Sequence, residues 1–154
     1  MNEISVRRAG IDDLDALTRL FDAYRQFYEQ PSDMDGARRF LGERIARMDS
    51  TIFLAEDSGD RLGFCQLFPS FTSTGMARTY ILNDLFVSPD GRGRGVGKAL
   101  LHAAVKFGFD EGAVRLTLST AHENKVAQSL YAACGWKRDE DFIVFHRRKG
   151  DMEA

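Results

Sequence analysis

The stretch most able to carry chemistry is a glycine-rich loop between an expected strand and an expected helix. It reads Gly91-Arg92-Gly93-Arg94-Gly95-Val96-Gly97-Lys98. Glycine lets the backbone adopt positive φ and approach a ligand without a Cβ in the way. The start of a helix adds unpaired N–H groups and a partial positive charge, and Arg92, Arg94 and Lys98 add formal positive charge. We therefore predict that this loop binds a pyrophosphate.

The spacing of these glycines excludes two common nucleotide-binding motifs. In the P-loop pattern, Arg92 stands where the first glycine is required, and Ala99 replaces the hydroxyl residue that binds magnesium. In the dinucleotide pattern Gly-x-Gly-x-x-Gly, all three registers fail because Val96, Lys98 or Leu100 occupies the third glycine position. The pattern that remains is Arg-x-x-Gly-x-Gly.

This pattern follows a strand-like run and resembles the acyl-CoA signature of the GNAT superfamily of N-acetyltransferases. A second block strengthens the resemblance, because it has the family's order and spacing: Asn124, Ala127, Leu130-Tyr131 and Gly135-Trp136. The resemblance implies that acetyl-CoA is the cosubstrate, with its pyrophosphate on the loop and its pantetheine arm along the strand backbone. The residues that the resemblance assigns to acetyl-CoA are Leu85, Phe86, Val87, Arg92, Gly93, Arg94, Gly95, Val96, Gly97, Lys98, Asn124, Ala127 and Tyr131.

Tyr131 also stands where the resembled family carries its general acid, which protonates the departing CoA thiolate. A phenol with a pKa of about 10 can donate to a thiolate whose conjugate acid has a pKa of about 8.5. The alternative interpretation is a core aromatic residue with a satisfied hydroxyl. Asn124 likewise has two compatible roles, as a ligand of the pantetheine amides and as the N-cap of the helix that follows it.

The general base is less well defined. Related diamine acetyltransferases carry Glu-Asp where this chain has Asn83-Asp84. With the Glu replaced, Asp84 becomes the second candidate catalytic residue, which would orient a cationic amine or accept its proton through water. The alternative for Asp84 is a buried structural carboxylate. Strict alternation along a strand would put Asn83 and Asp84 on opposite faces, so that only one of them would reach the acceptor.

The acceptor is expected beside the end of the first helix. Tyr24, Tyr28 and Glu29 lie there, and together with Asn83 and Asp84 they form the predicted acceptor site. The resemblance extends to the polyamine and histone acetyltransferase branch. We therefore predict acetyl transfer to a primary amine of a small cationic molecule, such as a polyamine or an amino-acid derivative. A protein or peptide lysine is the alternative acceptor, and a non-catalytic acyl-CoA-binding module is the alternative of a different class.

The expected elements have the order of the GNAT fold, in one domain over residues 1–154. This fold is of the α/β (α+β) class, with a mixed, mostly antiparallel sheet, a parallel splayed strand pair and flanking helices. We expect Pro69 to weaken the far end of the third strand, because proline cannot donate to a ladder. The expected strands are residues 4–8, 52–55, 62–68, 80–87, 114–121 and 142–146, and the expected helices are 14–28, 34–48, 96–111 and 123–134.

Composition and charge argue against several other classes of function. The net charge of −2 gives no support to nucleic-acid binding, and no apolar run is long enough to span a bilayer. The two cysteines, Cys65 and Cys134, lack the spacing of a metal site, and we expect them to be reduced thiols in a cytoplasmic protein. The N-terminus has no apolar signal-peptide core. No metal is implied, and a homodimer is possible because dimers are common in the resembled family.

Overall fold

A computed structural model describes residues 3–151 and contains a five-stranded sheet in the order β1-β2-β3-β4-β5. The pairs β1–β2, β2–β3 and β3–β4 are antiparallel, and β4–β5 is parallel. The predicted mixed, mostly antiparallel sheet is therefore confirmed. The elements are β1 (Ser5–Arg8), η1 (Ile11–Asp13), α1 (Leu14–Phe27), α2 (Met34–Arg47), β2 (Thr51–Asp57), β3 (Asp60–Thr72), β4 (Ala77–Val87), η2 (Pro89–Gly91), α3 (Val96–Asp110), β5 (Ala113–Thr117) and α4 (Lys125–Ala133).

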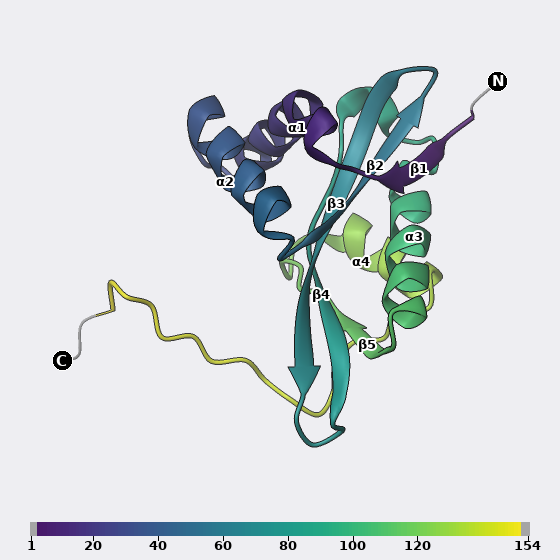
Figure 1. Ribbon diagram of the computed structural model, residues 1–154. Coiled ribbons are helices and arrows are strands. Elements are labelled where there is room, and N and C mark those ends of the chain that lie inside the picture. The colour runs from purple at the N-terminus through teal and green to yellow at the C-terminus, as the bar shows by residue number, and fades with distance from the viewer. Residues whose placement is uncertain (1–2, 152–154) are drawn as a thin grey trace.

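Helices cover both faces of the sheet. Figure 1 shows α1 and α2 on one side and α3 on the other. Leu17, Leu41 and Phe64 are fully buried on the side of α1 and α2. Leu100 and Leu101 are fully buried on the side of α3. Burial of one such side chain contributes roughly 1.5–3 kcal/mol, so the two cores hold the sheet between them.

A bulge in β4 changes which face its side chains reach. Leu67 of β3 pairs with Leu82, and the preceding residue, Gln66, pairs with Asp84, so Asn83 is an extra residue in β4. A bulge of this kind resets the alternation of side chains along the strand. As a result, Leu82 packs in the core beside α3, whereas Phe86 packs in the core beside α1 and α2.

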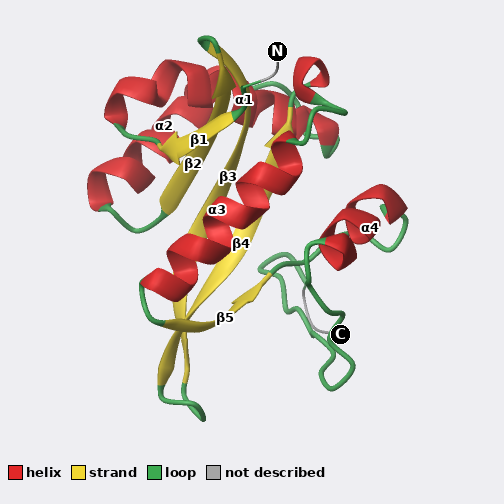
Figure 2. Ribbon diagram, turned by 90° about the vertical axis from the view of Figure 1, so that its right-hand side faces the viewer, coloured by secondary structure: helices red, strands yellow, loops and turns green. Residues whose placement is uncertain are grey.

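The parallel pair β4–β5 is short and then splays apart. The two strands pair only from Arg78 to Ile81 in β4, opposite Ala113–Thr117. Figure 2 shows β5 meeting β4 at one end and leaving it toward α4. The edge of β4 over residues 82–87 therefore faces an opening, while its other edge pairs with β3. This is the splayed strand pair that was predicted.

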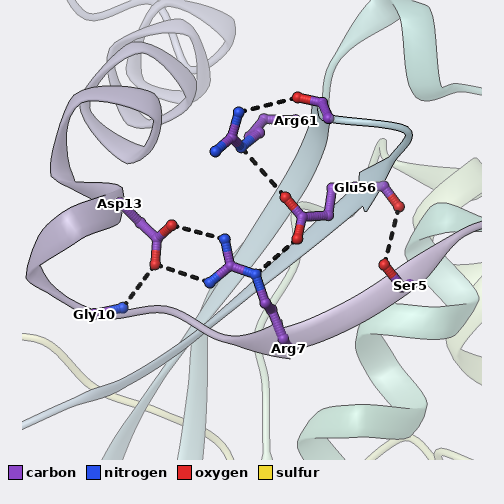
Figure 3. Close-up of polar contacts among 7 residues, drawn as sticks. Ser5, Arg7, Gly10, Asp13, Glu56 and Arg61 are labelled. Atoms are coloured by element: carbon purple, nitrogen blue, oxygen red, sulfur yellow. Dashed lines mark hydrogen bonds and ion pairs between the residues drawn. The ribbon is translucent and has the colours of Figure 1, made fainter.

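A polar network holds the N-terminal strand to the rest of the sheet (Figure 3). The Arg7 guanidinium donates to both carboxylate oxygens of Asp13, at 2.8 and 3.0 Å, and to Oε1 of Glu56 at 2.7 Å. Arg61 forms an ion pair with Glu56 from the other side. The contacts with Arg7 and with the Gly10 amide hold the pKa of Asp13 below its usual range.

Within residues 3–151, no helix is long and apolar enough to cross a bilayer.

Pro69 lies where β3 is paired on one side only. β3 continues through Pro69, which pairs with Tyr80 of β4, but β2 does not reach beyond Leu67. A different expectation about the strands is wrong. Residues 142–146 are described but form no strand, and they leave the body of the molecule in an extended path (Figure 1). An apolar run forms a strand only where another strand edge is available to pair with it.

Candidate active site

The glycine-rich loop connects β4 to α3 through the short helix η2. Gly93 and Gly95 adopt φ values of 73° and 81°, in the left-handed region that favours glycine. Gly95 is the N-cap of α3, so the amides of the first helical turn point out of the loop. A Cβ at either glycine would meet no protein atom within 4 Å. The open side of the loop therefore leaves these amides accessible to an anion.

The three positive side chains of the loop have different partners. Arg92 is exposed, and its Nε donates to the Val87 carbonyl at 3.2 Å. Lys98 is exposed on the first turn of α3. Arg94 instead forms an ion pair with Asp57 at the end of β2. Part of the predicted positive charge is therefore neutralised by this carboxylate, and Arg92 and Lys98 remain the exposed cations of the loop.

α4 packs against the start of α3 through Leu130. A Cβ on Gly97 would lie 3.2 Å from Cδ2 of Leu130, which shows how closely the two helices approach. Asn124 is the N-cap of α4, and its Oδ1 accepts a hydrogen bond from the Ala127 amide at 3.1 Å. Burial raises the pKa of Tyr131, so its hydroxyl keeps its proton at neutral pH.

A pocket opens between the splayed strands, α1 and α4. Tyr24 and Tyr28 line it from the C-terminal end of α1, and Tyr131 lines it from α4. Its other walls come from β4 and from the residues that follow β5. Of the predicted site residues, Tyr24, Tyr28, Asn83, Leu85 and Tyr131 line it. The full lining is Tyr24, Tyr28, Leu82, Asn83, Leu85, Leu118, Ser119 and Tyr131.

Asp84 lies behind the wall of this pocket and is only 7% exposed. Its carboxylate accepts hydrogen bonds from Nε2 of Gln66 at 2.8 Å and from Nδ2 of Asn83 at 3.1 Å. The Tyr24 hydroxyl lies close to the same carboxylate. Burial raises the pKa of Asp84 above its ordinary value, and Gln66, Tyr24 and Asn83 oppose that shift. Burial, together with the Asp84 charge, also raises the pKa of Tyr24.

The expectation that Asn83 and Asp84 would face opposite sides is wrong. The bulge breaks the strict alternation, and the Asn83 amide reaches the Asp84 carboxylate directly. Asn83 lines the pocket, and Asp84 supports both Asn83 and Tyr24 from behind. Both residues therefore belong to the same site, in two layers.

The loop between α1 and α2 forms the outer rim. Tyr28 is 47% exposed, and Glu29 is exposed with a φ of 63°. The loop is held by Asp22, whose carboxylate accepts from the Ser32 hydroxyl and from the Asp33 amide, both at 2.7 Å. These contacts hold the pKa of Asp22 below its usual range. Glu29 does not line the pocket, so it could interact with a positively charged acceptor only from the rim of the pocket.

Sequence reasoning missed several residues that support the site. Gln66 is completely buried, and its Oε1 accepts from the Ser50 hydroxyl at 2.8 Å while its Nε2 holds Asp84. A lone amide within the apolar strand Leu62–Phe68 was the available signal. Asp22 interrupts the apolar face of α1 in the same way. Nothing in the sequence indicated that Leu118 and Ser119 would line the pocket, because their position depends on how β5 splays away from β4.

The arrangement suits attack by an amine better than covalent catalysis by the protein. Burial raises the pKa of the Cys65 thiol to about 12, so this sulfur is not a nucleophile at neutral pH. Within residues 3–151, no group of three His, Cys, Asp or Glu side chains could hold a metal ion. The groups that face the pocket are hydroxyls, an amide and apolar side chains, with one carboxylate behind them.

Comparison with known proteins identifies the family. Residues 17–136 match the Acetyltransferase (GNAT) family. The uncharacterized N-acetyltransferase YhfO of Bacillus subtilis (strain 168) is 45% identical over 142 residues, which cover 92% of this chain and 95% of that protein.

Solved structures agree with this match. The crystal structure of a probable acetyltransferase superposes with a TM-score of 0.90 at 37% identity, covering 96% of this chain and 99% of that one. A structure of the enzyme AAC(6')-Iy with the bisubstrate analogue CoA-S-monomethyl-acetylneamine has a TM-score of 0.78 at 25% identity, covering 95% and 99%. With its splayed strands, glycine-rich loop and tyrosine-lined pocket, this chain belongs to the GNAT family of acetyl-CoA-dependent N-acetyltransferases.

Proposed function

We propose that this N-acetyltransferase transfers the acetyl group to a primary amine of a small cationic molecule, such as a polyamine, an aminoglycoside or an amino-acid derivative. The observation that carries the proposal is the two-layered wall of the pocket, in which the Tyr24 hydroxyl and the Asn83 amide are backed by the buried Asp84 carboxylate. Aromatic faces and a nearby negative charge both favour a cation.

The proposed proton path runs through Tyr24. Tyr24 lies close to Asp84 and lowers the pKa of its carboxyl group. With its own proton directed to Asp84, the hydroxyl oxygen keeps lone pairs that can accept a proton from the ammonium group of the acceptor. As that proton moves to Tyr24, the tyrosine passes its own proton to Asp84, and the amine becomes neutral. The raised pKa of Asp84 makes its carboxylate a better proton acceptor than an exposed aspartate.

The proposed acetyl transfer uses Tyr131 on the other side of the pocket. The neutral amine attacks the thioester carbonyl, the bond between carbon and sulfur breaks, and the Tyr131 hydroxyl protonates the leaving thiolate. The amide product keeps the acetyl group. In this proposal the pyrophosphate lies on the first turn of α3, and the pantetheine arm lies along the open edge of β4 at residues 85–87. Asn124 and Ala127 lie on the facing side.

The proposal takes residues 1–154 as one acetyltransferase domain. Because Cys65 and Cys134 are free thiols, we place that domain in the cytoplasm, where thiols stay reduced. The resemblance to the polyamine and histone acetyltransferase branch remains a prediction, and it concerns which amine receives the acetyl group. A protein lysine would have to enter past the exposed Tyr28, and a non-catalytic module would bind acetyl-CoA without using Tyr131.

The test is a thiol-release assay with acetyl-CoA and a panel of acceptors, run after calorimetry has established CoA binding. The panel contains spermidine, an aminoglycoside, free amino acids and a lysine peptide. We expect turnover with one of the small cationic amines. Turnover with the peptide alone would contradict the proposed acceptor class, and tight CoA binding without any turnover would favour the non-catalytic module.

Two variants test the proton path. Asp84→Asn and Tyr24→Phe should each lower kcat/KM for the amine by roughly 10²–10⁴-fold, the range for loss of acid–base assistance. CoA affinity should stay near that of the wild type, because neither residue faces the loop. If Tyr24→Phe retains full activity while Asp84→Asn loses it, the route through the tyrosine is wrong.

A further inference from the structure

The ion pair between Arg94 and Asp57 joins the glycine-rich loop to the hairpin of β2 and β3. One guanidinium nitrogen of Arg94 donates to Oδ2 of Asp57, and another donates to the Asp90 carbonyl at 3.5 Å. The side chains of Arg94 and Asp57 are only 24% and 12% exposed, so the pair is largely shielded from water. Salt weakens a shielded pair much less than a pair on the open surface.

Asp57 occupies a well-defined position at the end of β2. It pairs with Asp60 across the two-residue turn Ser58-Gly59. Both turn residues have positive φ, 51° and 87°, as in the tight hairpin turns that match the twist of the flanking strands. The Ser58 hydroxyl donates to Oδ1 of Asp57 at 3.2 Å, while Oδ2 accepts from Arg94. A donor on each oxygen thus fixes the orientation of this carboxylate.

The stretch of loop around Arg94 is intrinsically free to change conformation. Arg94 lies between Gly93 and Gly95, where an added Cβ would meet no protein atom within 4 Å. Glycine populates positive and negative φ about equally, so neither glycine fixes its own conformation. The start of the loop is fastened by its backbone, because the Ser88 amide donates to the Leu62 carbonyl of β3 at 2.8 Å. The middle of the loop is fastened by the Arg94 side chain.

We propose that Asp57 is a positioning residue for acetyl-CoA. It holds the Arg94 guanidinium, and through it the backbone of residues 93–95, in the conformation that presents the first amides of α3 to the pyrophosphate. Arg94 then anchors the loop, whereas Arg92 and Lys98 supply its exposed positive charge. This role rests on the proposed position of the pyrophosphate on the first turn of α3.

An anchored loop binds more tightly because it is already in the binding conformation. The apparent affinity of a ligand falls in proportion to the fraction of molecules that have this conformation. Asp57→Asn keeps the size of the side chain but removes the charge that holds Arg94, so the loop samples other glycine conformations. If about one molecule in ten keeps the binding conformation, the dissociation constant for CoA rises about tenfold. An Arg94 that bound the phosphates directly would behave in the opposite way, because its release from Asp57 would leave CoA binding unchanged or make it tighter.

Calorimetry with CoA tests the proposal on the full-length protein and needs no acceptor. Asp57→Asn and Arg94→Gln should each raise the dissociation constant about tenfold. The double variant should bind no more weakly than the weaker single variant, because both changes remove the same contact. Asp110→Asn is the matched control, since it breaks the ion pair with Lys106 at the other end of α3 and should leave CoA affinity unchanged. Unchanged or tighter binding by Asp57→Asn, or losses that multiply in the double variant, would overturn the proposal.

Steady-state kinetics separates positioning from general damage to the fold. With any amine that the enzyme acetylates, Asp57→Asn should raise KM for acetyl-CoA about tenfold. Both kcat and KM for the amine should stay near the wild-type values, because a saturating cosubstrate keeps the loop in its binding conformation. Circular dichroism checks that the variant is folded. A rise in both KM values, or a fall in kcat, would overturn the proposal.

Gly95→Asp distinguishes a failure of this inference from a failure of the proposed pyrophosphate site. Tight CoA binding by Gly95→Asp would place the pyrophosphate elsewhere and overturn both. Loss of CoA binding in Gly95→Asp, together with unchanged binding in Asp57→Asn, would overturn the role of Asp57 alone. We expect both variants to lose affinity, and Gly95→Asp to lose more.

Discussion

At the scale of single residues, the site depends on a chain of hydrogen bonds behind its visible wall. Ser50 donates to Gln66, Gln66 donates to Asp84, and Tyr24 lies close to Asp84 on the pocket side. A carboxylate in this position keeps a fixed orientation, because each of its oxygens already has a donor. Its affinity for a proton then depends on the balance between burial, which raises its pKa, and these donors, which lower it.

Gln66→Leu should change this balance in a known direction. The substitution removes a donor to the ionised form of Asp84, so the pKa of Asp84 rises further above its ordinary value. The acidic limb of kcat/KM for the amine acceptor should therefore move to higher pH. Ser50→Ala is the control, since it removes a partner of Gln66 but leaves the donor to Asp84 in place. If the limb stays at the same pH in Gln66→Leu, it belongs to a different group.

Tyr131→Phe separates catalysis from binding. If the hydroxyl protonates the leaving thiolate, its removal should lower kcat by roughly 10²–10⁴-fold while the calorimetric CoA affinity changes little. Tyr80→Phe is the matched control, because Tyr80 is 6% exposed and packs in the core beside α3. An unchanged kcat in Tyr131→Phe would show that Tyr131 lines the pocket but is not the general acid.

At the scale of elements, the loop between β4 and α3 combines backbone conformation with access. Gly95 has a φ of 81° and open space beside it, and so does Gly59 in the turn between β2 and β3, with a φ of 87°. A side chain at either position carries the same left-handed strain of about 1–2 kcal/mol. Only Gly95 caps the helix that is proposed to hold the pyrophosphate.

The variants Gly95→Asp and Gly59→Asp can be compared directly, because both glycines have a left-handed backbone conformation and open space beside them. Both variants should lose a similar amount of thermal stability. Gly95→Asp alone should weaken CoA binding by more than about a hundredfold, because a carboxylate beside the pyrophosphate costs several kcal/mol. Calorimetry with CoA measures the difference. Tight binding by Gly95→Asp would show that the pyrophosphate lies elsewhere.

The elements also show what the sequence could and could not predict. Glycine spacing and helical periodicity located the loop, α3 and α4 because those signals are local. The bulge at Asn83 left no local signal, since it is defined by the pairing of Gln66 and Leu67 on another strand. The strand expected at residues 142–146 failed for a related reason. Its apolar pattern suits a strand, but a strand also has to pair with another strand, and residues 142–146 do not.

At the scale of the whole molecule, the splay between β4 and β5 has a consequence for backbone motion. Hydrogen bonds to β3 protect one edge of β4 along its length, but past Ile81 the other edge has no β5 residue opposite it. Amides on that open edge exchange with deuterium without breaking a ladder, and a cosubstrate arm laid along them would slow that exchange. Slowed deuterium exchange at residues 82–87 would therefore show that the cosubstrate occupies this opening, before any acetyl transfer has taken place.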